Sequence, residues 1–255
     1  MAEVTEEVTG ANPLVEYRCA YQPENIQGKT MSHTVAKVRE KVAPFRFKLV
    51  AREISKELQL SLGDRVLELG SGLGLLGRAV KDEVCGGVDY FGIELAYKSA
   101  RAGSKQGLLE SQANVIDLPF PNDTFDALVT TDVLEHIKDS GRAVSEIFRV
   151  LKLGGKAFVV IADSSEARFS KVQGHIHRTG NGSDMEYWED LFKNSGLRVL
   201  SKDSEKYRER DWRKIFNLPF LVKLKEKPGF DCAFNPVDRP GTYIIEKPVN
   251  FLEGH

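Results

Sequence analysis

Four glycines stand at short intervals in residues 66–77, which read VLELGSGLGLLG. Glycines at a turn from strand to helix let the backbone come close to a ligand, because no Cβ blocks the approach. Gly72 to Gly77 alone has the G-x-G-x-x-G spacing of a dinucleotide loop, a pattern of low specificity by itself. We therefore expect a nucleotide-type ligand here, with a tight turn that binds nothing as the alternative.

Three carboxylates are expected near this loop, at the ends of successive strands: Glu68, Glu94 and Asp117. Open α/β sheets bind ligands outside the carboxyl ends of their strands, so these side chains should face one crevice. Glu94 would accept hydrogen bonds from ribose hydroxyls, each worth roughly 1.5–3 kcal/mol. Asp117 would meet the exocyclic amine of an adenine. The alternative for each acid is a solvated strand end.

Short apolar runs alternate with amphipathic segments from residue 64 onward. Strands are predicted at residues 65–69, 89–94, 113–116, 125–131, 156–161, 197–200 and 242–246. Helices are predicted at residues 74–83, 95–108, 141–151 and 185–194, the third ended by Gly154 and Gly155. A further helical period at residues 32–60 is kinked at Pro44. The alternation predicts a parallel sheet with right-handed crossovers.

The composition is that of a globular protein. The chain has 255 residues, 41% hydrophobic and 29% charged, which excludes a disordered chain and a membrane bundle. A net charge of −1 disfavours nucleic acid as a partner. Three scattered cysteines without C-x-x-C spacing, and an acidic N-terminus unlike a signal peptide, favour a cytoplasmic location.

We expect one domain: a cap (1–60), a ligand-binding core (61–165) and a part completing the sheet (166–255).

Five ordered motifs resemble those of class I S-adenosylmethionine-dependent methyltransferases, in the branch called methyltransferase domain 11. They are ELGSGLG (68–74), FGIE (91–94), NVIDLPF (114–120), FDALVTTDVLEH (125–136) and EIFRVLKLGG (146–155). The resemblance covers about residues 62–161 and continues weakly to 199. It implies a Rossmann-like α/β fold with a doubly wound, seven-stranded, mostly parallel sheet, the last strand antiparallel, and an N-terminal helical cap.

The resemblance also implies S-adenosyl-L-methionine as the cofactor. The glycine loop would hold the methionine portion, Glu94 the ribose, and Asp117 with the Leu118 amide the adenine edge. The complete set of implied cofactor-binding residues is Glu68, Gly70, Ser71, Gly72, Gly74, Glu94, Leu95, Asp117, Leu118 and Thr131. A nicotinamide dinucleotide is the competing cofactor. The Tyr-x-x-x-Lys pattern of short-chain reductases occurs only at residues 243–247, inside a predicted strand, which disfavours it.

Methyl transfer from a sulfonium is an in-line displacement in which the enzyme mainly aligns the acceptor and excludes water. Such positioning can supply about 7–11 kcal/mol of the barrier. A general base is needed only where the acceptor must lose a proton. Candidates are His136 after the fourth strand and His175 and His177 after the fifth, with packing or solvation as the alternative. Asp132 and Glu135 beside His136 make a thin metal pattern, and we predict no metal.

We expect methyl transfer to an O, N or C atom of a small molecule. The alternatives are a methyltransferase of RNA or protein, which the basic segment at residues 37–56 keeps open, and a binding module without turnover. Residues 202–227 are an insertion on the acceptor side. Within it, residues 210–225 predict a lid, a helix on a membrane surface, or an amphipathic helix packed on the sheet edge.

Overall fold

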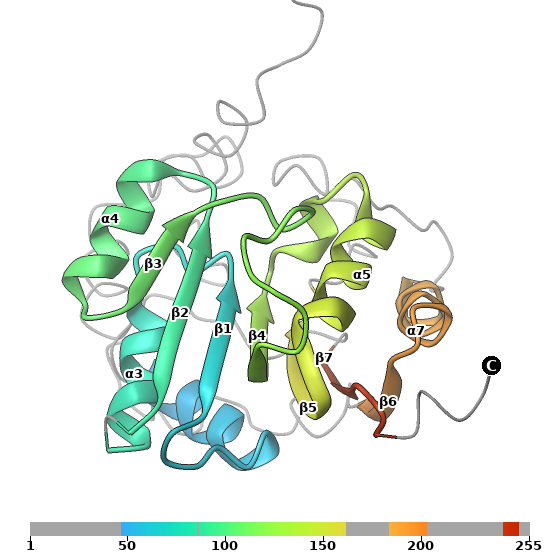
Figure 1. The fold of residues 1–255 in the computed structure, drawn as a ribbon, viewed down its shortest axis with the longest axis horizontal. Coiled ribbons are helices and arrows are strands. Elements are labelled where there is room, and N and C mark those ends of the chain that lie inside the picture. Colours follow the sequence, from blue (N-terminus) through green and yellow to red (C-terminus); the bar gives the residue numbers. More distant parts are fainter. Residues whose placement is uncertain (1–46, 86, 162–183, 203–241, 250–255) are drawn as a thin grey trace, which may run out of the picture.

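The computed structural model describes residues 47–85, 87–161, 184–202 and 242–249. Seven strands in these ranges form one sheet in the order β3-β2-β1-β4-β5-β7-β6 (Figure 1). The strands are β1 (Arg65–Leu69), β2 (Asp89–Glu94), β3 (Leu109–Gln112), β4 (Phe125–Thr131), β5 (Leu151–Val160), β6 (Arg198–Lys202) and β7 (Thr242–Glu246). The pairs among β1 to β5 are parallel, and β7 is antiparallel to both β5 and β6. The predicted fold class is confirmed.

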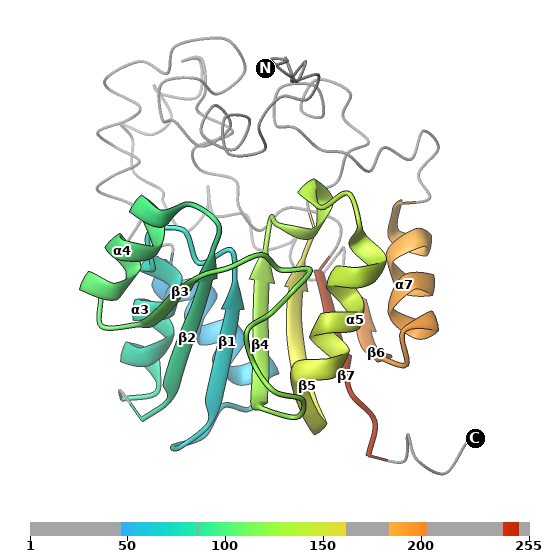
Figure 2. The ribbon, with the colours of Figure 1, turned by 45° about the horizontal axis from the view of Figure 1, so that its top comes forward.

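Helices cover both faces of the sheet. They are α3 (Leu75–Glu83), α4 (Tyr97–Lys105), α5 (Ser140–Val150), α7 (Asp184–Asn194), a short 3-10 helix η2 (Leu134–His136) and a helix over residues 47–57. The 47–57 helix and α3 share one buried core, which includes Ile54 and Val80. α5 and α7 share the other, which includes Ile147 and Phe192. Figure 2 shows α5 in front of the sheet and the 47–57 helix behind it.

α5 illustrates how the sequence places a helix on this sheet. Its buried apolar positions, Ala143, Val144, Ile147 and Val150, recur at helical spacing and turn one stripe toward the sheet. The Asp139 side chain caps the first turn by accepting a hydrogen bond from the Arg142 N–H at 3.0 Å. Polar side chains line a neighbouring stripe of the helix, which is described below.

The third strand was predicted wrongly. Residues 113–116 were expected to form it, but β3 lies at Leu109–Gln112, paired in parallel with β2. The chain leaves α4 early because Gly107 adopts a left-handed φ of 80° that no helix continues through. Asp117 consequently does not end a strand: it lies in a turn beyond β3.

The junction of α5 and β5 also differs from the prediction. Gly154 and Gly155 do not end the helix, which stops at Val150 and passes directly into a long β5. A Cβ at Gly155 would lie 2.8 Å from the Lys152 carbonyl oxygen and 3.1 Å from the Asp126 carbonyl oxygen. Glycine is needed here because the pairing of β4 with β5 shifts register at this point.

Several predictions fall outside the described residues. These are the cap before residue 47, His175, His177 and the insertion at 202–227 except for its first residue. In the ranges that the structure covers, no helix is long and apolar enough to cross a bilayer.

Candidate functional site

The loop between β1 and α3 brings bare backbone to the carboxyl edge of the sheet. A Cβ at Gly74 would lie 2.7 Å from the Gly103 Cα, and one at Gly70 would overlap the Val133 side chain. At Gly72, by contrast, no atom of the described residues lies within 4 Å of an added Cβ, and φ is +55°. Packing therefore requires the glycines at 70 and 74, whereas Gly72 presents an open backbone surface that a ligand can approach.

Glu94 closes β2 directly against this loop. Its Oε2 accepts a hydrogen bond from the Gly72 N–H at 3.0 Å, and its Oε1 accepts one from the Ala96 N–H at 2.8 Å. The residue is 1% exposed, so it is not a solvated strand end. Parallel pairing of β1 with β2 causes this proximity, since the Gly70 N–H also donates to the Ile93 carbonyl at 2.7 Å. The structure thus places Glu94 in direct contact with the glycine loop, the two features that the sequence indicated most strongly.

Two further acids, Glu68 and Glu110, lie beneath the loop, on the face of the sheet that α3 covers. Glu68, Gly92 and Glu110 face one another across β1, β2 and β3 in the strand register. Gly92 has no side chain, and the Glu110 carboxylate occupies the place that a Cβ would take. The Ser71 hydroxyl donates to Glu110 Oε2 at 2.7 Å, which ties the loop to β3. Spacing along the chain does not reveal this row, because it depends on the register of three strands.

Burial controls the ionisation of these acids. It raises the pKa of Glu68 to about 8; the neighbouring Tyr90 hydroxyl opposes the rise, and the charges of Glu110 and Glu94 add to it. Burial also raises the pKa of Glu110, against the hydrogen bond from Ser71. Glu68 is 3% exposed, and its Oε2 has no hydrogen-bond partner of good geometry among the described residues. Glu68 is therefore largely protonated at neutral pH, unlike the solvated acid considered from the sequence.

The turn after β3 contains the residues predicted to meet an adenine. The Asp117 N–H donates to the Asn114 carbonyl at 3.0 Å, and the Asp117 side chain is exposed. The Leu118 N–H is already donated to Glu146 Oε2 at 2.7 Å, so a ligand would have to displace that bond to use it. Asn114, which is exposed, lies two residues beyond β3 and forms an isolated bridge with Asp117, was not among the predicted site residues. Ending the strand at Gln112 would have singled it out.

β2 and β3 are also joined at the edge where these side chains lie. The Gln112 side-chain amide donates to the Leu95 carbonyl at 3.0 Å. Leu95, the residue after Glu94, exposes 36% of its surface. An exposed apolar side chain beside a buried acid suits a ligand that has both a flat apolar part and hydroxyl groups.

The carboxyl end of β4 borders the glycine loop on its other side. Thr131 ends the strand, and Asp132 follows with a left-handed φ of 56°, an uncommon conformation for a residue with a side chain. His136 is the last residue of the short 3-10 helix η2, shortly after the carboxyl end of β4. Within the parts of the chain that the structure describes, no group of three His, Cys, Asp or Glu side chains could hold a metal ion.

Comparison with known proteins identifies this arrangement. Residues 67–159 match a family model described as "Methyltransferase domain". The chain carries a class I S-adenosylmethionine-dependent methyltransferase domain. The matched residues run from β1 to β5 and so contain the glycine loop, Glu94, the turn after β3 and α5.

Individual relatives of the methyltransferase domain are distant. The ubiquinone/menaquinone biosynthesis C-methyltransferase UbiE of Geotalea daltonii is 30% identical over 45% of this chain and 51% of its own length. Squalene methyltransferase 1 of Botryococcus braunii is 30% identical over 76% of this chain and 48% of its own length. The chain thus spans about half the length of these curated relatives.

Solved structures share the fold. Phosphoethanolamine N-methyltransferase 2 of Haemonchus contortus, in complex with phosphomonomethylethanolamine and S-adenosylhomocysteine, superposes with a TM-score of 0.57 at 18% identity. The superposition covers 78% of this chain and 52% of that one. At this identity the likeness concerns the fold alone.

Proposed function

We propose that the protein binds S-adenosyl-L-methionine and transfers its methyl group to an O, N or C atom of a small molecule. The contact that carries the proposal is the Glu94 carboxylate, which two backbone N–H groups hold against Gly72 of the glycine loop. Family membership and the open backbone at Gly72 support it.

The described residues fit such a cofactor by their chemistry. Glu94 would accept hydrogen bonds from the ribose hydroxyls, and the Gly72 backbone would lie against the methionine portion. Leu95 and the turn at residues 114–117 would enclose the adenine, with Asn114 and Asp117 as its polar neighbours. When bound, the cofactor supplies an activated methyl group on a sulfonium.

The protein's own part in the reaction is then mainly to position the acceptor and exclude water, which can supply about 7–11 kcal/mol of the barrier. His136 belongs to η2, just after the carboxyl end of β4, on the side where an acceptor would approach. It would take a proton from the acceptor only if the acceptor atom carries one that must leave. His175 and His177 remain candidates for the same role.

A small-molecule acceptor is favoured by the relatives and by the charge. The curated relatives named above are a quinone-biosynthesis enzyme and a squalene enzyme, and both names refer to small molecules. The net charge of −1 gives no general attraction to nucleic acid. The atom that receives the methyl group is left to experiment.

Two measurements test the proposal. Calorimetry should detect binding of S-adenosylhomocysteine, whereas NADH should neither bind nor raise the melting temperature. Stabilisation by NADH but not by S-adenosylhomocysteine would overturn the proposal. Incubation of the full chain with a metabolite extract and methyl-labelled cofactor should then place the label on a small molecule. Label on RNA or protein instead would overturn the acceptor class while leaving the cofactor in place.

A further inference from the structure

The connection from β3 to β4 is unusual for a parallel sheet because it contains no helix. Residues 113–124 run between the two strands with only turns and one isolated bridge, between Asn114 and Asp117. A segment without regular structure must still satisfy its backbone N–H and C=O groups where they are buried. The partners of this segment therefore show what holds it.

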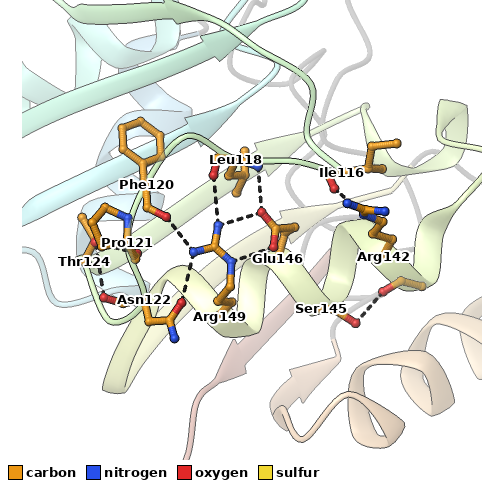
Figure 3. A network of polar contacts seen from close by, with 11 residues as sticks. Ile116, Leu118, Phe120, Pro121, Asn122, Thr124, Arg142, Ser145, Glu146 and Arg149 are labelled. Carbon is orange, nitrogen blue, oxygen red and sulfur yellow. Dashed lines mark hydrogen bonds and ion pairs between the residues drawn. The ribbon is translucent and has the colours of Figure 1, made fainter.

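α5 supplies many of those partners from its polar stripe (Figure 3). Arg142 donates from Nε to the Ile116 carbonyl at 2.8 Å. Arg149 donates to the Leu118 carbonyl at 3.0 Å and to the Phe120 carbonyl at 2.6 Å. Arg142, Glu146 and Arg149 follow one another at intervals of four and three residues, so they lie along one face of the helix. We call these three side chains the α5 clamp.

The charged groups of the α5 clamp support one another. Arg149 Nε lies 2.7 Å from Glu146 Oε1, and both side chains are mostly buried, at 29% and 15% exposed. The hydrogen bonds that Arg149 donates to the Glu146 carboxylate lower the pKa of Glu146 and raise the pKa of Arg149, and the charge of Asp117 adds to the rise for Arg149. Asp117 is therefore close enough to interact with Arg149 electrostatically.

We propose that Glu146 and Arg149 are positioning residues for the nucleobase end of the cofactor. Together with Arg142, they hold the backbone on both sides of Asp117, at the Ile116 carbonyl and at both backbone groups of Leu118. In this chain the Leu118 N–H anchors the turn to Glu146 and does not read the base. The exposed side chains of Asn114 and Asp117 are what the anchored turn presents.

The remainder of the connection has its own support, so the clamp acts mainly on the turn. The Phe120 ring packs edge-on against Phe125 and Phe91, with centroids 4.8 Å and 6.0 Å apart. The Thr124 N–H donates to the Val150 carbonyl at 2.8 Å, at the start of β4. Loss of the clamp should therefore loosen the turn at residues 114–118 while the aromatic contacts and the sheet persist.

The test compares two ligands that differ only at the base. S-inosylhomocysteine carries a carbonyl where S-adenosylhomocysteine carries the 6-amino group, so the ratio of their affinities reports how well the turn reads the base. The variants are Arg149→Lys and Glu146→Gln. The matched control is Arg78→Lys, which alters another intrahelical arginine pair, with Asp82 on α3. Calorimetry gives the affinities, and thermal melts confirm that each variant is folded.

We expect the wild type to prefer S-adenosylhomocysteine at least tenfold, and Arg149→Lys to weaken its binding by about five- to tenfold. The preference should shrink toward unity in both α5 variants and stay intact in the control. A lowered melting temperature with an unchanged ratio would overturn the proposal, as would a wild type that does not distinguish the ligands. Because this role rests on the proposed function, failure of the wild type to bind S-adenosylhomocysteine would instead overturn that function.

Discussion

Gly70 and Val133 are in such close contact that a Cβ at Gly70 would overlap Cγ2 of Val133. Gly70 begins the loop after β1, and Val133 follows β4, so the contact joins the candidate cofactor loop to the edge where an acceptor would enter. Any side chain at residue 70 must push these two turns apart.

Gly70→Ala should therefore destabilise the fold through two separable effects. The φ of 71° costs an L residue about 1–2 kcal/mol, and the overlap with Val133 adds about 1–3 kcal/mol. Adding Val133→Ala removes the overlap only, so urea unfolding of the double variant should show a smaller loss than the sum of the single variants. Strict additivity would mean that the two turns do not touch in solution.

Gly72→Ala tests the open backbone of the loop. Gly63 is the matched control. It too has a positive φ, and in the part of the chain that the structure describes no atom lies within 4 Å of an added Cβ, but it lies before β1, away from the site. Both substitutions should lower the free energy of unfolding by about 1–2 kcal/mol. Only Gly72→Ala should abolish binding of S-adenosylhomocysteine in calorimetry. If the two variants bound S-adenosylhomocysteine with equal affinity, the ligand would not bind at this loop.

Glu94→Ala should weaken binding of S-adenosylhomocysteine at least tenfold, since it removes charge-assisted hydrogen bonds to the ribose worth roughly 1.5–3 kcal/mol each. The Gly72 and Ala96 N–H groups also lose their acceptor in this variant. Glu94→Gln retains one acceptor oxygen and serves as the control for that structural loss. An affinity unchanged in both variants would exclude Glu94 as the ribose ligand.

Glu68→Gln should make the protein more stable at alkaline pH. The folded-state pKa of about 8 exceeds the ordinary value of 4.5, so the folded protein keeps a proton that the unfolded chain releases between these values. The wild type therefore loses stability as pH rises from 4.5 to 8, whereas the amide does not titrate. Between pH 5 and pH 8 the advantage of the variant should grow by on the order of 3–4 kcal/mol.

Urea unfolding of the ligand-free protein at both pH values measures this advantage. Glu186→Gln, at an exposed position on α7, is the control and should show no such growth. A constant difference between Glu68→Gln and the wild type would mean that Glu68 is ionised in the folded protein.

Sequence patterns predicted those elements whose signal lies within a few consecutive residues. β1, β2, β4 and β7 have the predicted bounds because each is an apolar run limited by turn residues or glycines. β3 was missed because LESQ has no apolar run, and only its pairing with β2 makes it a strand. The start of β5 was predicted five residues too late because Gly154 and Gly155, usual just after a helix end, instead lie inside the irregular first part of this strand.

The same distinction, between features visible in a short stretch of sequence and features that depend on long-range contacts, applies to the candidate site. Glu94 and the glycine loop were visible because a known motif joins them. Two other features depend on contacts between residues 18 to 31 positions apart, which the spacing of residues along the chain does not reveal. They are the row of Glu68, Gly92 and Glu110, and the contacts of the α5 clamp with the turn after β3. Side chains far apart in sequence become neighbours only through strand register and helix rotation.

The position of β7 has a consequence for synthesis of the protein. β7 lies inside the sheet, between β5 and β6, although residues 242–246 are made about 80 residues after β5 is complete. Until they leave the ribosome, β5 is an edge strand and β6 has no neighbour to pair with. A growing chain that stops before residue 242 therefore exposes the unpaired backbone N–H and C=O groups along the edge of β5 that later pairs with β7. Such an open edge can pair with other chains and aggregate.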